Sequence, residues 1–355
     1  SEYGGDMWFG SAYDADPDFS LKDPDIGEYG SATMGHELGH ALGLSHAHEG
    51  GGGFGTVPAD RDAMEFTIMS YQSFPGAGFG GYSNATGSYA QTIMMYDIAA
   101  IQFMYGANFT TNGTDTVYSF SVTTGEMLIN GVGQGNTSAT NTVFRTIWDG
   151  DGVDTYDFSN YATSLNVNLN PGEYTDLDTA GNFQSADLGG TYALGHVYNA
   201  LQYNGDVRSL IENAIGGSGN DIMTGNAANN TLEGRSGDDT LNGGEGDDIL
   251  LGGAGFDTLN GGAGNDTLNG GGVDSSLADN LFGGDGDDTL LTTGSDYGAN
   301  YDGGAGIDTL DLSGFTWDGY IVNLAAGTNQ EVIEGIVYTI TGVENVIGTN
   351  KDDTL

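Results

Sequence analysis

The chain has 355 residues, and its 50 Asp and Glu against 6 Lys and Arg give a formal net charge of −44 at pH 7. So few basic side chains cannot neutralise a phosphate backbone or an anionic lipid surface, which argues against nucleic-acid binding. The absence of Cys excludes disulfides, thiolate zinc sites and thiol catalysis. No apolar run of about 18 residues is present, so no membrane insertion is expected. Short Asp carboxylates in this excess suit calcium loops.

Two amphipathic segments predict helices in the first third of the chain. The first covers residues 31–45, and Gly43 is expected to end it in the left-handed conformation. The second covers residues 92–105, with Asp97 as a candidate cap of its second half. The expected core positions are Ala32, Leu38, Ala41 and Leu42 in the first helix, and Ile93, Ile98, Ile101 and Tyr105 in the second.

From about residue 108 the pattern changes from helix to sheet. Short runs with a period close to two occupy residues 116–122, 142–148 and 165–169, and Gly, Asn and Asp separate them. This alternation of β-type runs and turn residues predicts strands. A related flank follows the repeats described next, at residues 308–348.

A nonapeptide repeat, G-G-x-G-x-D-x-U-x with U usually Leu, begins at Gly216. Eight units lie in register between residues 216 and 311, and longer units at residues 270–282 and 292–302 interrupt them. Such a repeat is typical of a calcium-binding parallel β-helix, in which U faces inward. Two units would make one coil, so the carboxylates of every second unit should stack in two columns. The columns are expected to contain Asp221, Asp239 and Asp257 on one side, and Asn230, Asp248, Asp266, Asp288 and Asp308 on the other.

A metal-binding pattern, H-E-x-x-H-x-x-G-x-x-H, begins at His36. Residues one helical turn apart share one helix face, so His36 and His40 can reach one ion. Gly43 lets the chain turn so that His46 supplies a third nitrogen, and three imidazoles leave an open position on zinc. Glu37 stands beside the ligands as a candidate general base toward water.

The segment T-I-M-S-Y, which contains Met69 and Tyr71, follows His46 after a Gly-rich stretch. Together with the histidine pattern it resembles the metzincin metalloproteases, whose Met-turn lies beneath the zinc ligands. The Met-Ser-Tyr form joined to nonapeptide repeats is similar to the serralysin family. That resemblance implies that Tyr71 is a further zinc ligand and supports the oxyanion during hydrolysis, and that Met69 has a structural role.

The resemblance covers nearly the whole chain and sets the expected organisation. The predicted fold class is α+β, with a partial metzincin zinc-protease domain followed by an all-β domain with a parallel β-roll of the RTX type. Residues 5–9 resemble the last strand of the family's N-terminal sheet, and residues 350–355 resemble the start of another repeat, so both ends are expected to be cut. The expected domains are residues 1–107 (protease), 108–215 (β-rich), 216–311 (calcium roll) and 312–355 (second β flank leading into a truncated repeat).

The implied function is that of a secreted, extracellular zinc endopeptidase that hydrolyses protein or peptide substrates and uses zinc and calcium as cofactors. The expected site residues are Glu37 and Tyr71 for catalysis; His36, His40, His46 and Tyr71 for zinc; Asp221, Asp239, Asp248, Asp257, Asp266, Asp288 and Asp308 for calcium; and Met69 and Gly43 for structure. The alternative is a calcium-dependent adhesion or surface-layer protein without enzymatic activity, in which the protease segment is incomplete.

Overall fold

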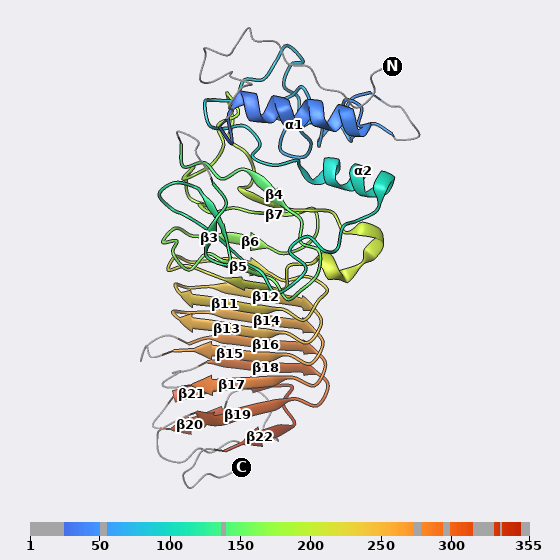
Figure 1. Ribbon diagram of the computed structural model, residues 1–355. Coiled ribbons are helices and arrows are strands. Elements are labelled where there is room, and N and C mark those ends of the chain that lie inside the picture. The colour runs from blue at the N-terminus through green and yellow to red at the C-terminus, as the bar shows by residue number, and fades with distance from the viewer. Residues whose placement is uncertain are drawn as a thin grey trace. The chain divides into compact units, whose positions relative to one another are not determined.

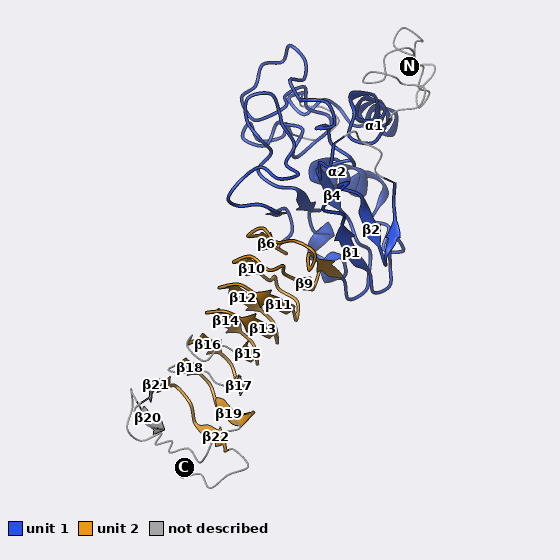
Figure 2. Ribbon diagram, turned by 90° about the vertical axis from the view of Figure 1, so that its left-hand side faces the viewer, with its two compact units in different colours: residues 1–154, 171–210 blue, residues 155–170, 211–355 orange. Residues whose placement is uncertain are grey.

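The structure is a computed structural model. It describes residues 25–49, 55–135, 140–272, 278–293, 299–314, 330–333 and 336–348. The expected strand at residues 5–9 and the expected partial repeat at residues 350–355 lie outside these ranges. The chain divides into two compact units (Figure 2). One comprises residues 1–154 and 171–210, and the other comprises residues 155–170 and 211–355. The bounds of the four domains expected from the sequence stay predictions.

The first unit contains the two α-helices of the described residues, α1 (Tyr29–Leu42) and α2 (Met95–Tyr105) (Figure 1). α1 ends where Gly43 adopts a φ of 103°, a left-handed conformation that glycine takes without a Cβ penalty. Asp97 occupies the first turn of α2, and its carboxylate accepts a hydrogen bond from the Met94 backbone N–H at 2.9 Å. It therefore caps the start of α2 and not a second half of the helix.

Two predicted core positions are wrong. Leu38 is 44% exposed, because the buried side of α1 follows Ala32, His36 and Gly39 at helical spacing and Leu38 falls outside that stripe. Tyr105 is 66% exposed. It is the last residue of α2, and its hydroxyl donates to the Leu42 carbonyl at 2.8 Å while much of the side chain stays accessible to solvent.

The strands of the first unit form two small groups. In one, β1 (Val117–Phe120), β2 (Met127–Ile129) and β3 (Val132–Gly133) are antiparallel neighbours. In the other, β8 (Val197–Asn199) lies between β4 (Arg145–Ile147) and β7 (Tyr174–Thr175). Two short 3₁₀ helices follow, η2 (Tyr203–Gly205) and η3 (Val207–Ser209). The described part of the segment between α1 and α2 is irregular backbone.

That irregular segment carries much of the core of the first unit. Met64, Phe66, Ile68 and Met69 are buried and belong to one cluster, together with Met94 and Met95 at the start of α2 and with Phe144 and Tyr198 from the region of β4 and β8. Apolar side chains from three regions of the sequence therefore hold this loop in place. The loop includes the predicted Met-turn.

The second unit is built from two long sheets of short strands (Figure 1). In this unit, the strands of one sheet follow the order β22-β19-β17-β15-β13-β11-β9-β5. The strands of the other follow the order β20-β21-β18-β16-β14-β12-β10-β6. Among the described strands of this unit, neighbours pair in parallel, except for the antiparallel pair of β20 and β21. The bounds are β5 (Thr155–Asp157), β6 (Asn166–Asn168), β9 (Asn213–Ile215), β10 (Ile222–Thr224), β11 (Thr231–Ser236), β12 (Thr240–Glu245), β13 (Ile249–Ala254), β14 (Thr258–Ala263), β15 (Thr267–Gly271), β16 (Asn280–Asp285), β17 (Thr289–Thr293), β18 (Asn300–Ala305), β19 (Thr309–Gly314), β20 (Gln330–Ile333), β21 (Ile336–Thr341) and β22 (Asn345–Ile347).

Successive strands of the repeat alternate between the two sheets, which confirms that two units make one coil. Leu232 on β11 is in register with Leu250 on β13, its counterpart two units later. The same register is kept across both longer units, as Leu259 with Leu281 and Leu290 with Leu310 show. The inward position is fully buried along the roll, at Met223, Leu232, Leu241, Leu250, Leu259, Leu268, Leu281, Leu290 and Leu310. The mostly β architecture with long parallel sheets agrees with the predicted roll.

None of the described helices is long and apolar enough to cross a membrane.

Candidate active site and calcium-binding columns

Three histidines converge at the end of α1. His36 and His40 lie one helical turn apart, and His46 follows the turn at Gly43. One ligand nitrogen from each ring lies within 4.8 Å of those of the other two. His36 is buried, and the other two rings are half-buried. The structure thus brings together the three side chains that the sequence predicts as zinc ligands.

Hydrogen bonds fix which nitrogen of each ring is available. His36 Nδ1 lies 2.7 Å from the Ile68 carbonyl and His40 Nδ1 lies 2.8 Å from the Leu44 carbonyl. A carbonyl oxygen only accepts, so both Nδ1 atoms carry the proton and both Nε2 atoms keep a lone pair. His46 Nδ1 lies 3.1 Å from a Glu49 carboxylate oxygen, which sets the same tautomer. Hydrogen-bond acceptors of this kind on the ring nitrogen that does not bind the metal, here Nδ1, are typical of metal-binding histidines.

The Nε2 atoms of the three histidines are arranged as ligands of one cation would be. His40 Nε2 and His46 Nε2 lie 3.0 Å apart. Since the tautomers place a lone pair on each, neither atom can donate to the other, and a cation beside them would offset their repulsion. Burial lowers the pKa of His36, and the neighbouring His40 and His46 lower it further, which favours the neutral ligand form. Neutral imidazoles at this spacing match a zinc donor set.

Glu37 and Tyr71 border the cluster. Glu37 is exposed, and its charge raises the pKa of both His36 and Tyr71, so it acts electrostatically on both. The Tyr71 hydroxyl donates to His46 Nε2 at 2.5 Å. Partial burial, followed by the charges of Glu49 and Glu37, raises the pKa of Tyr71, which keeps its hydroxyl protonated as a donor.

Met69 packs directly against α1. A Cβ added to Gly39 would lie 2.5 Å from Met69 Sδ, closer than real contacts allow. Gly39 is one of the unspecified positions of the histidine pattern, and here it gives the Met-turn room beneath the histidines. Sequence reasoning missed Gly39, because the pattern leaves its position free.

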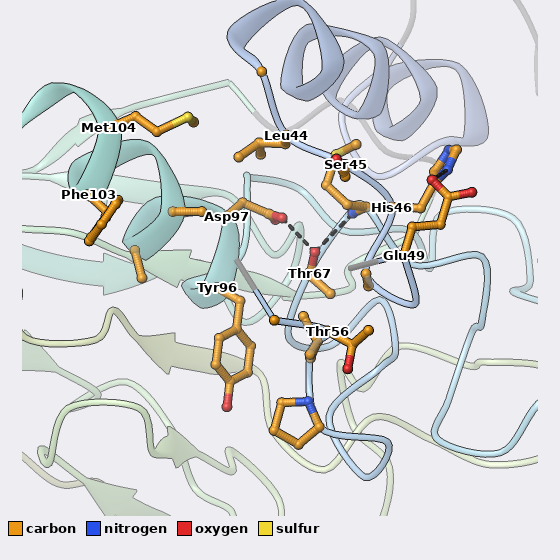
Figure 3. Close-up of a pocket in the computed structure, with 18 residues that line it drawn as sticks. Leu44, Ser45, His46, Glu49, Thr56, Thr67, Tyr96, Asp97, Phe103 and Met104 are labelled. Atoms are coloured by element: carbon orange, nitrogen blue, oxygen red, sulfur yellow. Dashed lines mark hydrogen bonds and ion pairs between the residues drawn. The ribbon is translucent and has the colours of Figure 1, made fainter. Parts of the chain in front are cut away.

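Asp97 on α2 anchors the Met-turn through hydrogen bonds. Its carboxylate accepts from the Thr67 hydroxyl at 2.6 Å and from the Ile68 N–H at 2.9 Å. Figure 3 shows Asp97 directed at Thr67 across this contact. Burial raises the pKa of Asp97 to about 6, although these hydrogen bonds lower it. Since the Ile68 carbonyl accepts from His36, Asp97 supports the candidate ligand His36 through one intervening residue.

A cavity of about 610 Å³ adjoins the cluster on the side of α2 (Figure 3). His46 and Met69 form part of its wall. Most of its other lining residues are apolar, among them Leu44, Val57, Pro58, Phe103 and Met104. An apolar recess therefore lies next to the third histidine.

The carboxylates of the roll form the two expected columns. In each step the backbone N–H of one residue donates to the Oδ1 of the Asp in the next coil, as Asp248 does to Asp266 at 2.8 Å. The same contact links Asp266 to Asp288 and Asp288 to Asp308, which confirms the stacking predicted across the longer units. The other column links Asp221, Asp239 and Asp257 in the same way.

Except at Asp221, where Oδ2 accepts from the Gly217 N–H at 2.8 Å, the second oxygen of these carboxylates lacks a hydrogen-bond partner among the described residues. The atoms concerned are the buried Oδ2 atoms of Asp239, Asp248, Asp257, Asp266, Asp288 and Asp308. At Gly243 an added Cβ would collide with Asp248 Oδ2 and with the Gly261 carbonyl, so the orphan oxygen lies near further backbone oxygens. Burial raises the pKa of Asp239 and of Asp248 to about 7. Buried hard oxygens without donors fit calcium.

Two members of the columns were not predicted. Asp279 continues the first column, since its Oδ1 accepts from the Asp257 N–H at 2.9 Å. It belongs to the first of the longer units, where the D-x-L ending of the repeat is preserved at Asp279 and Leu281 and could have revealed it. Glu344 extends the second column by accepting from the Asp308 N–H at 2.9 Å.

The comparisons with known proteins agree with this arrangement. Residues 107–277 match the family model described as Peptidase M10 serralysin C terminal. Serralysin B of Dickeya chrysanthemi is 37% identical over 210 residues, which cover 58% of this chain and 38% of that protein. Metallopeptidase AprA of Pseudomonas marginalis is 33% identical over 229 residues, which cover 63% of this chain and 42% of that protein. The chain is related to the serralysin-type metalloproteases.

The relationship has a limited extent. The chain spans about two fifths of the length of the curated relatives that it matches, including Serralysin A of Dickeya chrysanthemi at 39%. The family model covers the C-terminal region of the serralysins, and its match begins after the histidine cluster. The chemistry of this chain is therefore inferred from its own geometry.

Proposed function

We propose that the chain is a secreted zinc-dependent endopeptidase whose β-roll binds calcium. The observation that carries the proposal is the set of three Nε2 atoms, each freed by a hydrogen bond on the opposite nitrogen, in rings whose ligand atoms lie within 4.8 Å of one another. The relationship to metalloproteases supports a peptide substrate.

His36, His40 and His46 would hold the zinc, with Tyr71 as a further ligand or donor. When bound, zinc supplies Lewis acidity toward the scissile carbonyl and lowers the pKa of water. Glu37 accepts the proton that water loses and returns it to the leaving amine, a role that its exposed position beside the ligands permits. The Tyr71 hydroxyl, kept protonated, donates to the oxygen on which negative charge develops.

Calcium would occupy the two columns of the roll. The orphan Oδ2 atoms together with backbone carbonyls would hold it there, and its charge would offset the repulsion between stacked carboxylates. Arg235 is the single basic residue between residues 216 and 311, so this segment has almost no cationic side chains of its own. The ion thereby stabilises the fold and takes no part in peptide hydrolysis.

Cleavage of casein by the whole chain tests the proposal. We expect activity that a zinc chelator abolishes in the presence of excess calcium and that added zinc restores. The Glu37→Gln variant with the same zinc content is the matched control. No cleavage by zinc-loaded, calcium-saturated chain would contradict the enzymatic proposal and favour the non-enzymatic adhesion role.

A further inference from the structure

Asp62 contacts the residues on both sides of Tyr71. Its Oδ1 accepts a hydrogen bond from the Ser70 hydroxyl at 2.6 Å, and its Oδ2 accepts from Gln72 Nε2 at 2.9 Å. All three side chains are buried, whereas Tyr71 between them is 36% exposed. One buried carboxylate therefore binds both flanks of the residue that borders the histidines.

The backbone around Tyr71 is held as well. The Gln72 N–H donates to the Ser70 hydroxyl at 3.0 Å, and the Gln72 carbonyl accepts from the Met64 N–H at 2.9 Å. The Ser70 carbonyl accepts from the Tyr82 hydroxyl at 2.5 Å. With both neighbours fixed, the position of the Tyr71 hydroxyl depends on its own side-chain torsions.

We propose that Asp62 is a positioning residue that aims the Tyr71 hydroxyl at the reaction centre. The inference rests on the proposed peptidase function. Tyr has a long rigid side chain, so a small rotation of the backbone at its Cα displaces the hydroxyl much more than the Cα. A displacement of about 1 Å in a reacting group can cost about 10²-fold in rate. The two hydrogen bonds from the flanking Ser70 and Gln72 side chains to one buried carboxylate oppose such a rotation.

A double-mutant cycle between Asp62→Asn and Tyr71→Phe tests this role. The amide of Asp62→Asn keeps the shape but presents an NH₂ to one of the two donors. We expect kcat to fall about tenfold with KM changed less than about twofold. Because Asp62 acts through the Tyr71 hydroxyl, we expect Asp62→Asn to cause no further loss of kcat in the Tyr71→Phe background.

Asp97→Asn is the matched control, since Asp97 is another buried carboxylate that contacts the Met-turn. It holds Thr67 and Ile68, on the side of His36 and away from Tyr71. Its effect on kcat should therefore be equal in the wild-type and Tyr71→Phe backgrounds. Ser70→Ala, which removes only one contact of Asp62, provides a milder variant if Asp62→Asn folds poorly, and it should show the same non-additivity with Tyr71→Phe.

A measurement without turnover separates this inference from the proposed function. With 3-fluorotyrosine at position 71 of the zinc-loaded chain, we expect one sharp fluorine resonance that Asp62→Asn shifts or broadens and Asp97→Asn does not. If the wild type cleaves nothing and this difference is seen, the peptidase proposal fails and the positioning role stands. Additive losses in the cycle, or an unchanged fluorine signal in Asp62→Asn, would overturn the positioning role.

Discussion

Glu37 is exposed, whereas His36, the residue before it, is buried. This difference suits the two roles proposed for these neighbours. A buried imidazole can be held in place as a metal ligand, and an exposed carboxylate can exchange a proton with water. We expect Glu37→Gln to lower kcat by about 10²–10⁴-fold, as is common for the loss of a general base. Zinc content should be unchanged, since Glu37 is not one of the three converging residues.

Peptide hydrolysis measured together with bound zinc checks this prediction. Glu49→Gln is a suitable comparison, because Glu49 contacts His46 Nδ1 and its loss should weaken zinc binding more than turnover at saturating zinc. A Glu37→Gln variant that cleaves at the wild-type rate would show that the general base lies elsewhere.

Gly39 controls how closely α1 approaches the Met-turn. A Cβ at this position meets Met69 Sδ at 2.5 Å and Leu44 Cδ1 at 3.3 Å, so Gly39→Ala must displace a buried side chain. We expect a loss of about 1–3 kcal/mol in the free energy of unfolding, typical of overpacking in a core. Gly35→Ala on the same helix is the control, because its nearest neighbour is Ile68 Cδ1 at 3.1 Å, a milder contact.

Urea unfolding of the two variants distinguishes them. Equal losses at positions 35 and 39 would mean that the Met69 contact carries no special constraint. Gly39→Ala should also reduce zinc affinity, since the displaced Met-turn includes the Ile68 carbonyl that orients His36.

At the scale of elements, residue spacing predicted the features that are determined within one helix or one coil. The histidine pattern, the end of α1 at Gly43 and the stacking of the repeats all follow from short, regular spacings along one helix or one coil. The contacts of Asp62, Asp97 and Gly39 with residues 67–72 could not be predicted in this way, because irregular backbone brings their partners to them and no helix or strand spacing links the two. The exposed side of α1 at Leu38 was also missed, since the apolar pattern alone did not show which face is buried.

The roll offers two Asp positions that look alike in composition and differ in structure. Asp248 is buried in a column with an orphan Oδ2, whereas Asp285 is exposed at the end of β16, where other units have Ala254, Ala263 and Ala305. We expect Asp248→Ala to raise the calcium concentration at the midpoint of folding several-fold, because it removes a proposed ligand and breaks the column at Asn230.

Asp285→Ala should leave that midpoint nearly unchanged, since alanine already occupies the equivalent position in other coils. Circular dichroism of the whole chain during calcium titration measures both midpoints. Equal shifts for the two variants would contradict the assignment of calcium to the buried columns.

At the scale of the whole molecule, the charge of −44 makes folding depend on protons and cations. Burial raises the pKa of Asp239, Asp248 and Asp257 to about 7, well above the ordinary value of 3.8. When the folded pKa lies above the unfolded one, the folded state binds more protons, and stability is greatest below about pH 4 and is lost as pH rises toward 7. Without calcium, the roll should therefore become less stable between pH 5 and pH 8.

Calcium should reverse this dependence, because it binds the charged carboxylates and competes with protons. We expect the urea midpoint of the chain to fall from pH 5 to pH 8 in a calcium chelator, and to rise over the same interval in a fixed, subsaturating calcium concentration. Sodium chloride at matched ionic strength should weaken the fall of the urea midpoint in chelator, because salt screens the carboxylate charges. It should not reproduce the rise seen with calcium, because sodium ions do not replace the coordinated calcium. A urea midpoint that rises with pH in chelator would mean that the column carboxylates are charged in the folded state and are stabilised there without calcium.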